Sequence, residues 1–442
     1  MKKNKTYMKK RMYFILTLLL TVFTMTATAA TSIIDDGRGP WKMIVLSDVH
    51  LMAPQLLVKD GKAYEDYLEG DRKLLTESEE ILDSVSERVL RAKPDVVLIA
   101  GDLTKDGERV SHDLLAKRYL AVWKKAGIRV FVIPGNHDVN NPHAVEYIGD
   151  SARSVATVSA DEFAHIYNDY GYGNALARDA HSLSYVTQVI PGLRLLALDA
   201  CRYDDNSFKD NTCVTAGRLK PETLDFIKEQ VAAAKASGEK MIVMMHHGLV
   251  PHFSLEKKVL PEYLVEDNDN IAALMSQLGL KVIFTGHLHS NDAASDGEIT
   301  DVETGSTVSY PSSYRVVSVD DGTMHITTER LESIGSLAKR GVNLGDKEKK
   351  FAILSVRKMA KDYLPSAAPN EVINAIAKVV GEAYIYNLAG DEHPSEEWEK
   401  EKAAVTEGLK RVSPTVGEII GAIATSLTTD TPPADNDLTI TY

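Results

Sequence analysis

The chain of 442 residues contains only two cysteines, Cys201 and Cys213. Two cysteines are too few, and wrongly placed, for a structural zinc site. They are close enough in sequence for a disulfide to close the acidic loop between them, which holds Asp204, Asp205 and Asp210. We expect this disulfide in an exported chain, because oxidising compartments permit disulfides. The alternative is a pair of buried free thiols.

Acidic residues outnumber basic ones, with 63 Asp and Glu against 50 Lys and Arg and a formal net charge of −13. This balance argues against a nucleic-acid scaffold, since such proteins hold phosphates on a basic face. It does not exclude a small anionic substrate, because bound metal ions reverse the sign of the local field. The length and the 44% of hydrophobic residues allow two or three domains with a large core.

A long hydrophobic run is missing as well. The apolar run at residues 13–23 follows a basic start and precedes the small residues 27–29. This layout is typical of a secretory signal peptide at residues 1–30, and the run is shorter than the roughly 20 residues of a spanning helix. We predict an exported protein, periplasmic or secreted, with no stable membrane span after cleavage. The alternative is an uncleaved N-terminal anchor.

From Trp41 onward, apolar runs alternate with amphipathic stretches. The predicted strands cover residues 43–46, 96–100, 129–133, 193–198, 241–245 and 281–285, with a closing hairpin at 314–319 and 324–328. The predicted helices cover residues 74–90, 114–126 and 221–236. This order predicts an α/β fold, in which helices cover a parallel or mixed sheet. Residues 139–191 lack periodic runs, and we expect loops and short helices over the sheet edge.

Beyond residue 331 the strand signals vanish and helix formers dominate. Four helices are predicted, at residues 347–362, 371–388, 395–410 and 416–427. The sequence therefore divides into an α/β domain at 41–328, a helical C-terminal region at 331–427 and a tail at 428–442. The tail is rich in Thr, Asp and Pro, and we expect it to be disordered.

Five short polar clusters each follow an apolar run with strand character. They are Asp48-Val49-His50, Gly101-Asp102, Gly135-Asn136-His137-Asp138, His246-His247 and Gly286-His287-Leu288-His289. Binding sites of open α/β sheets gather at the carboxyl ends of the strands. Carboxylate and amide oxygens mixed with imidazole nitrogens suit Zn, Mn or Fe(II) better than Ca or Mg. Each cluster alone is weakly specific, but the ordered set predicts a site for two divalent metal ions.

The clusters resemble those of the calcineurin-like metallophosphoesterase superfamily, whose pattern runs D-x-H, G-D, G-N-H-D/E, H and G-H-x-H. Every block is matched in order from Asp48 to His289. The resemblance covers residues 41–328 and implies a catalytic domain there. It also implies a four-layer α/β/β/α sandwich, with two sheets face to face between helices. The helical C-terminal region is an addition that the resemblance does not cover.

The resemblance implies a role for each matched residue. One metal would be bound by Asp48, His50 and His289, the other by Asn136, His246 and His287, with Asp102 as a bridge. His137 would contact the phosphate and protonate the leaving group, with Asp138 orienting or charging it. His247 would point away from the metals if the strand continued.

Three further residues are candidates for substrate binding. His143 and His252 lie in loops that follow metal blocks, and Arg202 follows the strand at 193–198. An ordinary surface role is the alternative for each of them.

The residues around the second cluster, Gly101-Asp102, indicate which subgroup of the superfamily the chain resembles. Lys105 stands where purple acid phosphatases carry a Tyr that binds ferric iron, so that subgroup is disfavoured. Residues 101–107 look more like the branch of cyclic-nucleotide and glycerophosphodiester phosphodiesterases than like Ser/Thr protein phosphatases.

We therefore predict an exported phosphodiesterase that acts on a small phosphate ester. Its cofactors would be two divalent metal ions (Mn, Zn or Fe), with a metal-bound hydroxide attacking phosphorus directly. The alternatives are a phosphomonoesterase, a lipid or nucleotide-sugar pyrophosphatase of the same fold, and a non-catalytic binding protein that retains the metal site.

Overall fold

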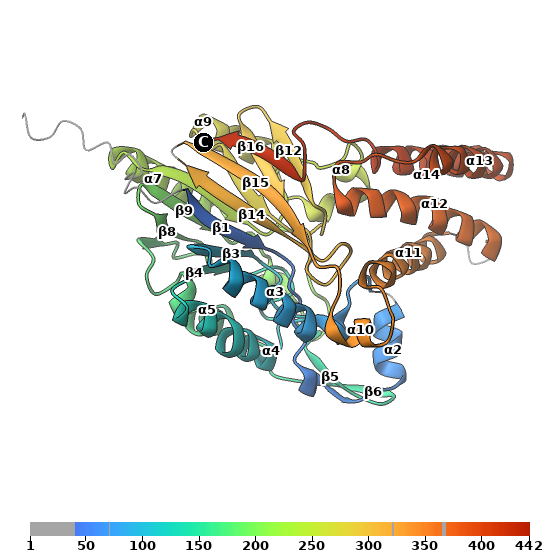
Figure 1. Ribbon diagram of the computed structural model, residues 1–442, viewed down its shortest axis with the longest axis horizontal. Helices are drawn as coiled ribbons and strands as arrows, with labels where there is room; N and C mark the ends of the chain where they lie inside the picture. The colour runs from blue at the N-terminus through green and yellow to red at the C-terminus, as the bar shows by residue number, and fades with distance from the viewer. Residues whose placement is uncertain (1–39, 70, 321, 365–367) are drawn as a thin grey trace, which may run out of the picture.

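The alternation of strands and helices is present in the computed structural model, which describes residues 40–69, 71–320, 322–364 and 368–442 (Figure 1). The predicted signal peptide lies outside the described residues. No helix within these ranges has the length and apolarity that crossing a membrane requires.

The first sheet has six strands in the order β16-β15-β14-β1-β3-β4. Their bounds are β1 (Trp41–Leu46), β3 (Val96–Ala100), β4 (Arg129–Ile133), β14 (Ser313–Asp320), β15 (Thr323–Arg330) and β16 (Asp437–Thr441). Strands β1, β3 and β4 are parallel, whereas β14, β15 and β16 pair antiparallel. All five residues of β3 are buried, which is why its sequence is continuously apolar.

The second sheet has seven strands in the order β12-β13-β11-β10-β9-β8-β7. Their bounds are β7 (Ala177–Arg178), β8 (Tyr185–Ile190), β9 (Leu193–Leu198), β10 (Lys240–Met245), β11 (Val282–Thr285), β12 (Asp292–Asp296) and β13 (Ile299–Glu303). Strands β9, β10, β11 and β13 are parallel. A small third sheet consists of β2 (Leu57–Lys59), β5 (Val145–Ile148) and β6 (Ser151–Ser154).

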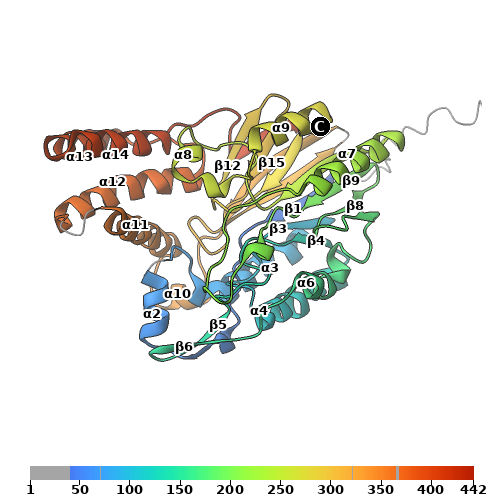
Figure 2. The same cartoon turned by 180° about the vertical axis from the view of Figure 1, so that it is seen from behind.

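The two large sheets pack face to face, since Val45 and Leu98 share one hydrophobic cluster with Leu195 and Phe284. The first sheet is covered by α3 (Ser78–Ala92), α4 (Arg109–Leu114), a π-helical turn (Leu115–Leu120) and α5 (Ala121–Lys125). The second is covered by α7 (Pro221–Ala236) and α9 (Asn268–Gln277), seen from behind in Figure 2. The predicted four-layer α/β/β/α sandwich is therefore confirmed.

Shorter helices connect these elements. They are α2 (Lys62–Glu69), α6 (Ala160–Ile166), α8 (Glu256–Val259), α10 (Gly335–Lys339) and the 3-10 turns Pro54–Leu56, Leu75–Glu77, Asn168–Tyr170, Tyr203–Asp205 and Pro261–Tyr263.

Two parts of the secondary-structure prediction are wrong. Residues 139–191 contain β5 to β8, and β8 pairs along β9 within the second sheet. Strands β12 and β13 were missed as well, because they carry Asp292, Asp301 and Glu303 at buried positions. A polar residue inside a strand hides the alternation that marks it in the sequence.

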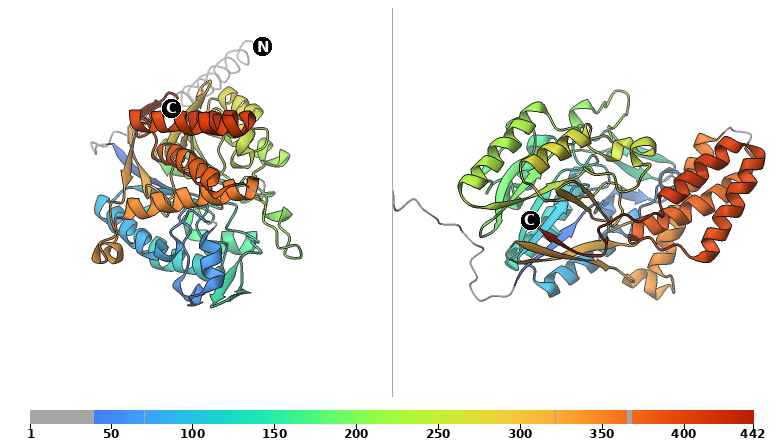
Figure 3. Two further views of the ribbon diagram at one scale, coloured as in Figure 1. Left: turned by 90° about the vertical axis from the view of Figure 1, so that its right-hand side faces the viewer. Right: turned by 90° about the horizontal axis from the view of Figure 1, so that it is seen from above.

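The predicted helical region is present as α11 (Leu344–Tyr363), α12 (Asn370–Ala389), α13 (Glu396–Val412) and α14 (Pro414–Ser426). These four helices form a lobe at one end of the sandwich, which we call the helical lobe (Figure 3). Its core includes Val379 and Trp398, and Leu288 of the α/β domain inserts into the same cluster. The lobe is thus packed directly on the loop that contains His287 and His289.

The prediction of a disordered tail is wrong at its end. Strand β16 pairs antiparallel with β15 from Asp437 to Thr441 and forms one edge of the first sheet. Leu438 and Ile440 are buried and alternate with exposed Thr439 and Thr441, which is the pattern of a strand with one covered face. Because β15 and β16 are neighbours, the helical lobe is an insertion between two adjacent strands.

Candidate metal centre

All five polar clusters lie at the carboxyl ends of strands that meet at one edge of the sandwich. They follow β1, β3 and β4 of the first sheet and β10 and β11 of the second. The structure brings their side chains into adjoining groups.

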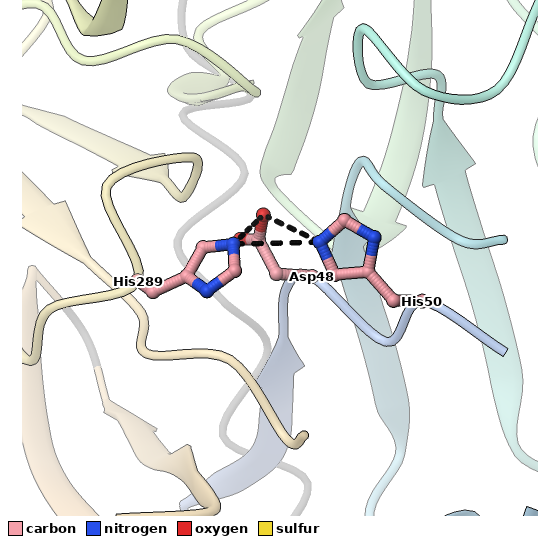
Figure 4. A group of neighbouring side chains, drawn as sticks. All are labelled: Asp48, His50 and His289. Carbon is pink, nitrogen blue, oxygen red and sulfur yellow. Dashed lines mark hydrogen bonds and ion pairs between the residues drawn. The ribbon is translucent and has the colours of Figure 1, made fainter. Parts of the chain in front are cut away.

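The first group consists of Asp48, His50 and His289, which point toward one another in Figure 4. The Nε2 atom of His289 lies 3.1 Å from Asp48 Oδ1 and 3.4 Å from His50 Nε2. Asp48 Oδ1 is buried and accepts no hydrogen bond from the described residues. A carboxylate oxygen and two ring nitrogens therefore converge on one point, which is a donor set that fits a cation.

The protonation of these rings fits the same role. Burial lowers the pKa of His50 to about 4 and the pKa of His289 to about 3. Both rings are then neutral at pH 7, the form that ligates metals. His289 Nδ1 lies 3.1 Å from Ser309 Oγ and 3.4 Å from Arg72 Nε, and these contacts fix the orientation of the ring.

The second group consists of Asp102, His246 and His287, joined by Asn136. His246 Nε2 lies 3.4 Å from Asp102 Oδ2 and 3.2 Å from Asn136 Oδ1. Its Nδ1 lies 2.8 Å from the carbonyl of Ala100, which fixes the ring and turns Nε2 toward the acids. Burial lowers the pKa of His246, but Asp102 overcomes this and raises it to about 9, so the carboxylate attracts positive charge to this point.

Asp102 connects the two groups. Its Oδ2 lies 3.5 Å from His50 Nε2 on one side and 3.4 Å from His246 Nε2 on the other. This is the position that a carboxylate bridging two metals would take. All seven residues predicted as ligands thus lie in one contiguous centre.

The backbone around the centre is strained. Five of the candidate ligands have positive φ: Asp48 (50°), His50 (41°), Asp102 (48°), His287 (77°) and His289 (73°). Such conformations cost non-glycine residues about 1–3 kcal/mol each and persist where the surroundings enforce them. Here they turn side chains from two sheets toward a common point.

Two glycines of the clusters are required for close approach. A Cβ atom on Gly135 would lie 2.1 Å from Asp102 Oδ1, and one on Gly286 would lie 1.8 Å from Ser47 Oγ. These distances are far below van der Waals contact. Any side chain at either position would displace the ligand loops.

His137 lies at the edge of the first group. Its ring stands edge-on to that of His50, with centroids 4.9 Å apart, and its Nε2 lies 3.9 Å from Asp102 Oδ2. Its Nδ1 lies 2.8 Å from Asp106 Oδ1. Burial and Lys73 lower the pKa of His137, but Asp102 and Asp106 outweigh them and raise it above the usual value.

The prediction that Asp138 orients His137 is wrong. The Asp138 carboxylate accepts the backbone N–H groups of Leu103, Thr104 and Gly135 at 2.8–3.0 Å, so it binds the two neighbouring loops together. Asp106 orients His137 instead.

Asp106 is held in turn by Lys105, which forms buried ion pairs with Asp106 and Glu108. The Asp106 carboxylate follows Asp102 in the same loop, and this proximity was the only signal of it in the sequence. His247 Nε2 lies 2.9 Å from the carbonyl of Thr215, and its ring packs against that of His287, with centroids 4.5 Å apart.

The three candidates for substrate contact are engaged elsewhere. Arg202 forms ion pairs with Asp205 and Glu266, and His143 Nε2 lies 3.0 Å from the carbonyl of Asn211. His252 is fully buried with Nδ1 2.9 Å from Asp292, so its predicted contact with substrate is wrong. Position in a loop after a cluster did not determine the direction of the side chain.

The expected disulfide is wrong as well, because Cys201 and Cys213 are both free. Each thiol faces a carbonyl beside the third cluster: Cys201 Sγ lies 3.4 Å from Pro134 O, and Cys213 Sγ lies 3.7 Å from Asn136 O. Of the two, Cys201 is buried and Cys213 is half-buried.

The chain matches the family described as calcineurin-like phosphoesterase over residues 42–291. No curated protein shows significant similarity to the sequence. The similar solved structures include a dimetal phosphatase from Danio rerio, at 13% identity over 66% of this chain and 97% of that chain, with a TM-score of 0.49. A putative 5′-nucleotidase from Staphylococcus aureus has 14% identity over 67% of this chain and 55% of that one, with a TM-score of 0.37. Vps29 from Entamoeba histolytica, complexed with zinc, has 13% identity over 66% of this chain and 92% of that one, with a TM-score of 0.26.

Proposed function

The chain belongs to the calcineurin-like phosphoesterase family of dinuclear-metal phosphoester hydrolases, and from this premise we propose that it is an exported phosphodiesterase. The observation that carries the two-metal hydrolase is the position of Asp102 Oδ2, between His50 Nε2 at 3.5 Å and His246 Nε2 at 3.4 Å. Support for the diester preference comes from residues 101–107 of the sequence. Support for export comes from residues 1–30 of the sequence.

Each group of side chains would hold one divalent ion. Asp48, His50 and His289 would hold the first, and Asn136, His246 and His287 the second, with Asp102 shared. Two such ions supply Lewis acidity toward a phosphate and lower the pKa of bound water. The mixed oxygen and nitrogen ligands favour Zn, Mn or Fe over Ca or Mg.

His137 would supply the proton that the leaving group needs. An alkoxide is a poor leaving group, so cleavage of an alkyl diester benefits from a positioned acid. Asp106 at 2.8 Å from Nδ1 keeps a proton on that nitrogen and directs Nε2 toward the centre. Asp102 and Asp106 raise the pKa of His137 and so favour the protonated ring.

The proposal is tested with bis-p-nitrophenyl phosphate and p-nitrophenyl phosphate, using protein loaded with Mn or Zn. We expect a higher kcat/KM for the diester. Turnover of neither ester would refute the hydrolase, and a higher value for the monoester would refute the diester preference. The control is Asp102→Ala, which we expect to lose both metals and all turnover.

A further inference from the structure

Arg72 lies in the loop between α2 and α3 and reaches the loop of His287 and His289. Its Nη2 donates to the carbonyl of Leu288 at 3.3 Å, and its Nε lies 3.4 Å from His289 Nδ1. The opposite nitrogen of the same ring, Nε2, faces Asp48. The imidazole ring of His289 therefore separates Arg72 from the point where the candidate ligands converge.

Two aromatic rings flank this guanidinium. Its central carbon lies 5.9 Å from the centroid of the Tyr263 ring and 5.7 Å from that of Tyr384. Tyr263 packs against His287, with ring centroids 4.5 Å apart, whereas Tyr384 comes from α12 of the helical lobe. Three distant segments of the chain thus meet beside both candidate ligands of the fifth cluster.

Arg72 donates hydrogen bonds to the loop of His289 but has no carboxylate partner within the described ranges. The adjacent Lys73, in contrast, pairs with Asp71 at 3.4 Å. The Tyr384 hydroxyl is buried and has no hydrogen-bond partner among the described residues. A buried hydroxyl without a partner is costly unless a ligand satisfies it. A guanidinium without a carboxylate partner can still bind an anion. Arg72 and Tyr263 remain partly exposed, so a ligand has access to them.

We propose that Arg72, Tyr263 and Tyr384 form a subsite for a second anionic group of the substrate, a carboxylate or a phosphate carried beyond the scissile phosphorus. The subsite rests on the proposed function, since it requires the phosphoester to bind at the metal centre. A guanidinium with free N–H groups binds either anion through paired hydrogen bonds. The Tyr384 hydroxyl adds one donor, and through it the helical lobe takes part in substrate selection.

The test is calorimetric titration of the metal-loaded full chain with matched ligands. The pair sn-glycerol 3-phosphate and 3-phosphoglycerate differs only by a distal carboxylate, and the pair propyl phosphate and propane-1,3-diol bisphosphate only by a distal phosphate. We expect at least one of the doubly anionic ligands to bind about tenfold or more tightly than its partner. The pair with the larger ratio identifies the anion.

Three variants decide the outcome. In Arg72→Gln the affinity ratio falls to near unity, and in Tyr384→Phe it falls about two- to fivefold. The control is Arg118→Gln, which makes the same change of charge at an exposed arginine that is paired with Glu79 and Asp83 on the outer helices. This control leaves the ratio unchanged.

The subsite is overturned if both pairs bind equally in the unmodified chain, or if the preference survives in Arg72→Gln. Failure of the proposed function is a separate result, because it shows as absent turnover of both p-nitrophenyl esters. Binding heats do not require turnover, so the binding ratios are read in either case.

Discussion

The Nε2 atoms of His50 and His289 lie 3.4 Å apart, beside a carboxylate oxygen of Asp48 that accepts no hydrogen bond from the described residues. A divalent cation at this point would bind both ring nitrogens and the carboxylate oxygen together. We predict that removing metal with EDTA at pH 7 lowers Tm by several degrees, and that Mn or Zn restores it. Bound ions at 100 times Kd add about 2.7 kcal/mol to the free energy of unfolding.

The control for this experiment is His289→Ala, whose Tm responds less to EDTA because one ligand of the first group is gone. Elemental analysis of the untreated protein gives the stoichiometry, for which we expect two ions per chain. If the protein contains no bound metal and EDTA does not change its Tm, the assignment of these residues as metal ligands is contradicted.

His137→Ala is predicted to keep both metals and to lose turnover by about 10²- to 10⁴-fold on alkyl diesters. The loss on bis-p-nitrophenyl phosphate is smaller, because p-nitrophenolate departs without a proton. The measurement is kcat/KM on both kinds of diester, together with metal content. Loss of metal, or equal losses on the two esters, would remove His137 from the role of acid.

Asp106→Asn is predicted to resemble His137→Ala in a weaker form, because the 2.8 Å contact that orients the ring is altered while the ring itself remains. The ratio of alkyl to p-nitrophenyl turnover falls. The matched variant Asp138→Asn alters a carboxylate that accepts three backbone N–H groups, so it lowers Tm and leaves this ratio unchanged. If Asp138→Asn changes the ratio instead, the roles given to the two acids are exchanged.

Leu288→Ala is predicted to destabilise the protein by about 2–5 kcal/mol, the usual cost of such a cavity. Leu288 packs into the core of the helical lobe between the two histidines of its loop. The variant therefore also weakens metal binding, measured by competition with a chelator. Leu196→Ala, a fully buried leucine in the core of the second sheet, lowers Tm without this loss.

Glu348 predicts a dependence of stability on pH. Burial raises the pKa of Glu348 to about 8 from an ordinary value of 4.5, with Ser312 donating a hydrogen bond to its carboxyl group. The folded chain therefore binds a proton that the unfolded chain has lost. The contribution is fully present below pH 4.5 and declines as pH rises to about 8, by at most roughly 1.4 kcal/mol per pH unit.

Glu348→Gln keeps an acceptor for Ser312 and removes the charge. Between pH 5 and 8, Tm of this variant is expected to fall less steeply than that of the unmodified chain, as measured by calorimetry. Parallel curves for the two proteins would show that Glu348 is not protonated in the folded state.

Much of the fold was predictable because its strands are buried on both faces. Continuous apolar runs such as residues 96–100 marked the strands, and the ligand clusters followed each run at once. The four helices of the lobe were found from their spacing. Strands β12 and β13 were not, since Asp301 is buried there by accepting N–H groups from Leu249 and Val250, a contact between distant segments.

The sequence predicted the candidate ligands of the site better than the residues that contact them. Asp48, Asp102 and His289 follow directly from motif spacing, because strand ends place them at a common edge. Asp106 and Arg72 do not, since their roles depend on contacts with His137 and His289 that only the folded chain creates. Side-chain direction in loops is the part that local sequence did not determine.

Because β16 pairs with β15, the helical lobe can be removed without separating the strands that flank it. Thr328 donates its N–H to the carbonyl of Asn436 at 3.0 Å, so the entrance and the exit of the helical lobe are neighbours. A short turn between these two points would delete the lobe as one piece while both sheets kept every strand. All seven candidate ligands would remain in the shortened chain, and Tyr384 would be gone.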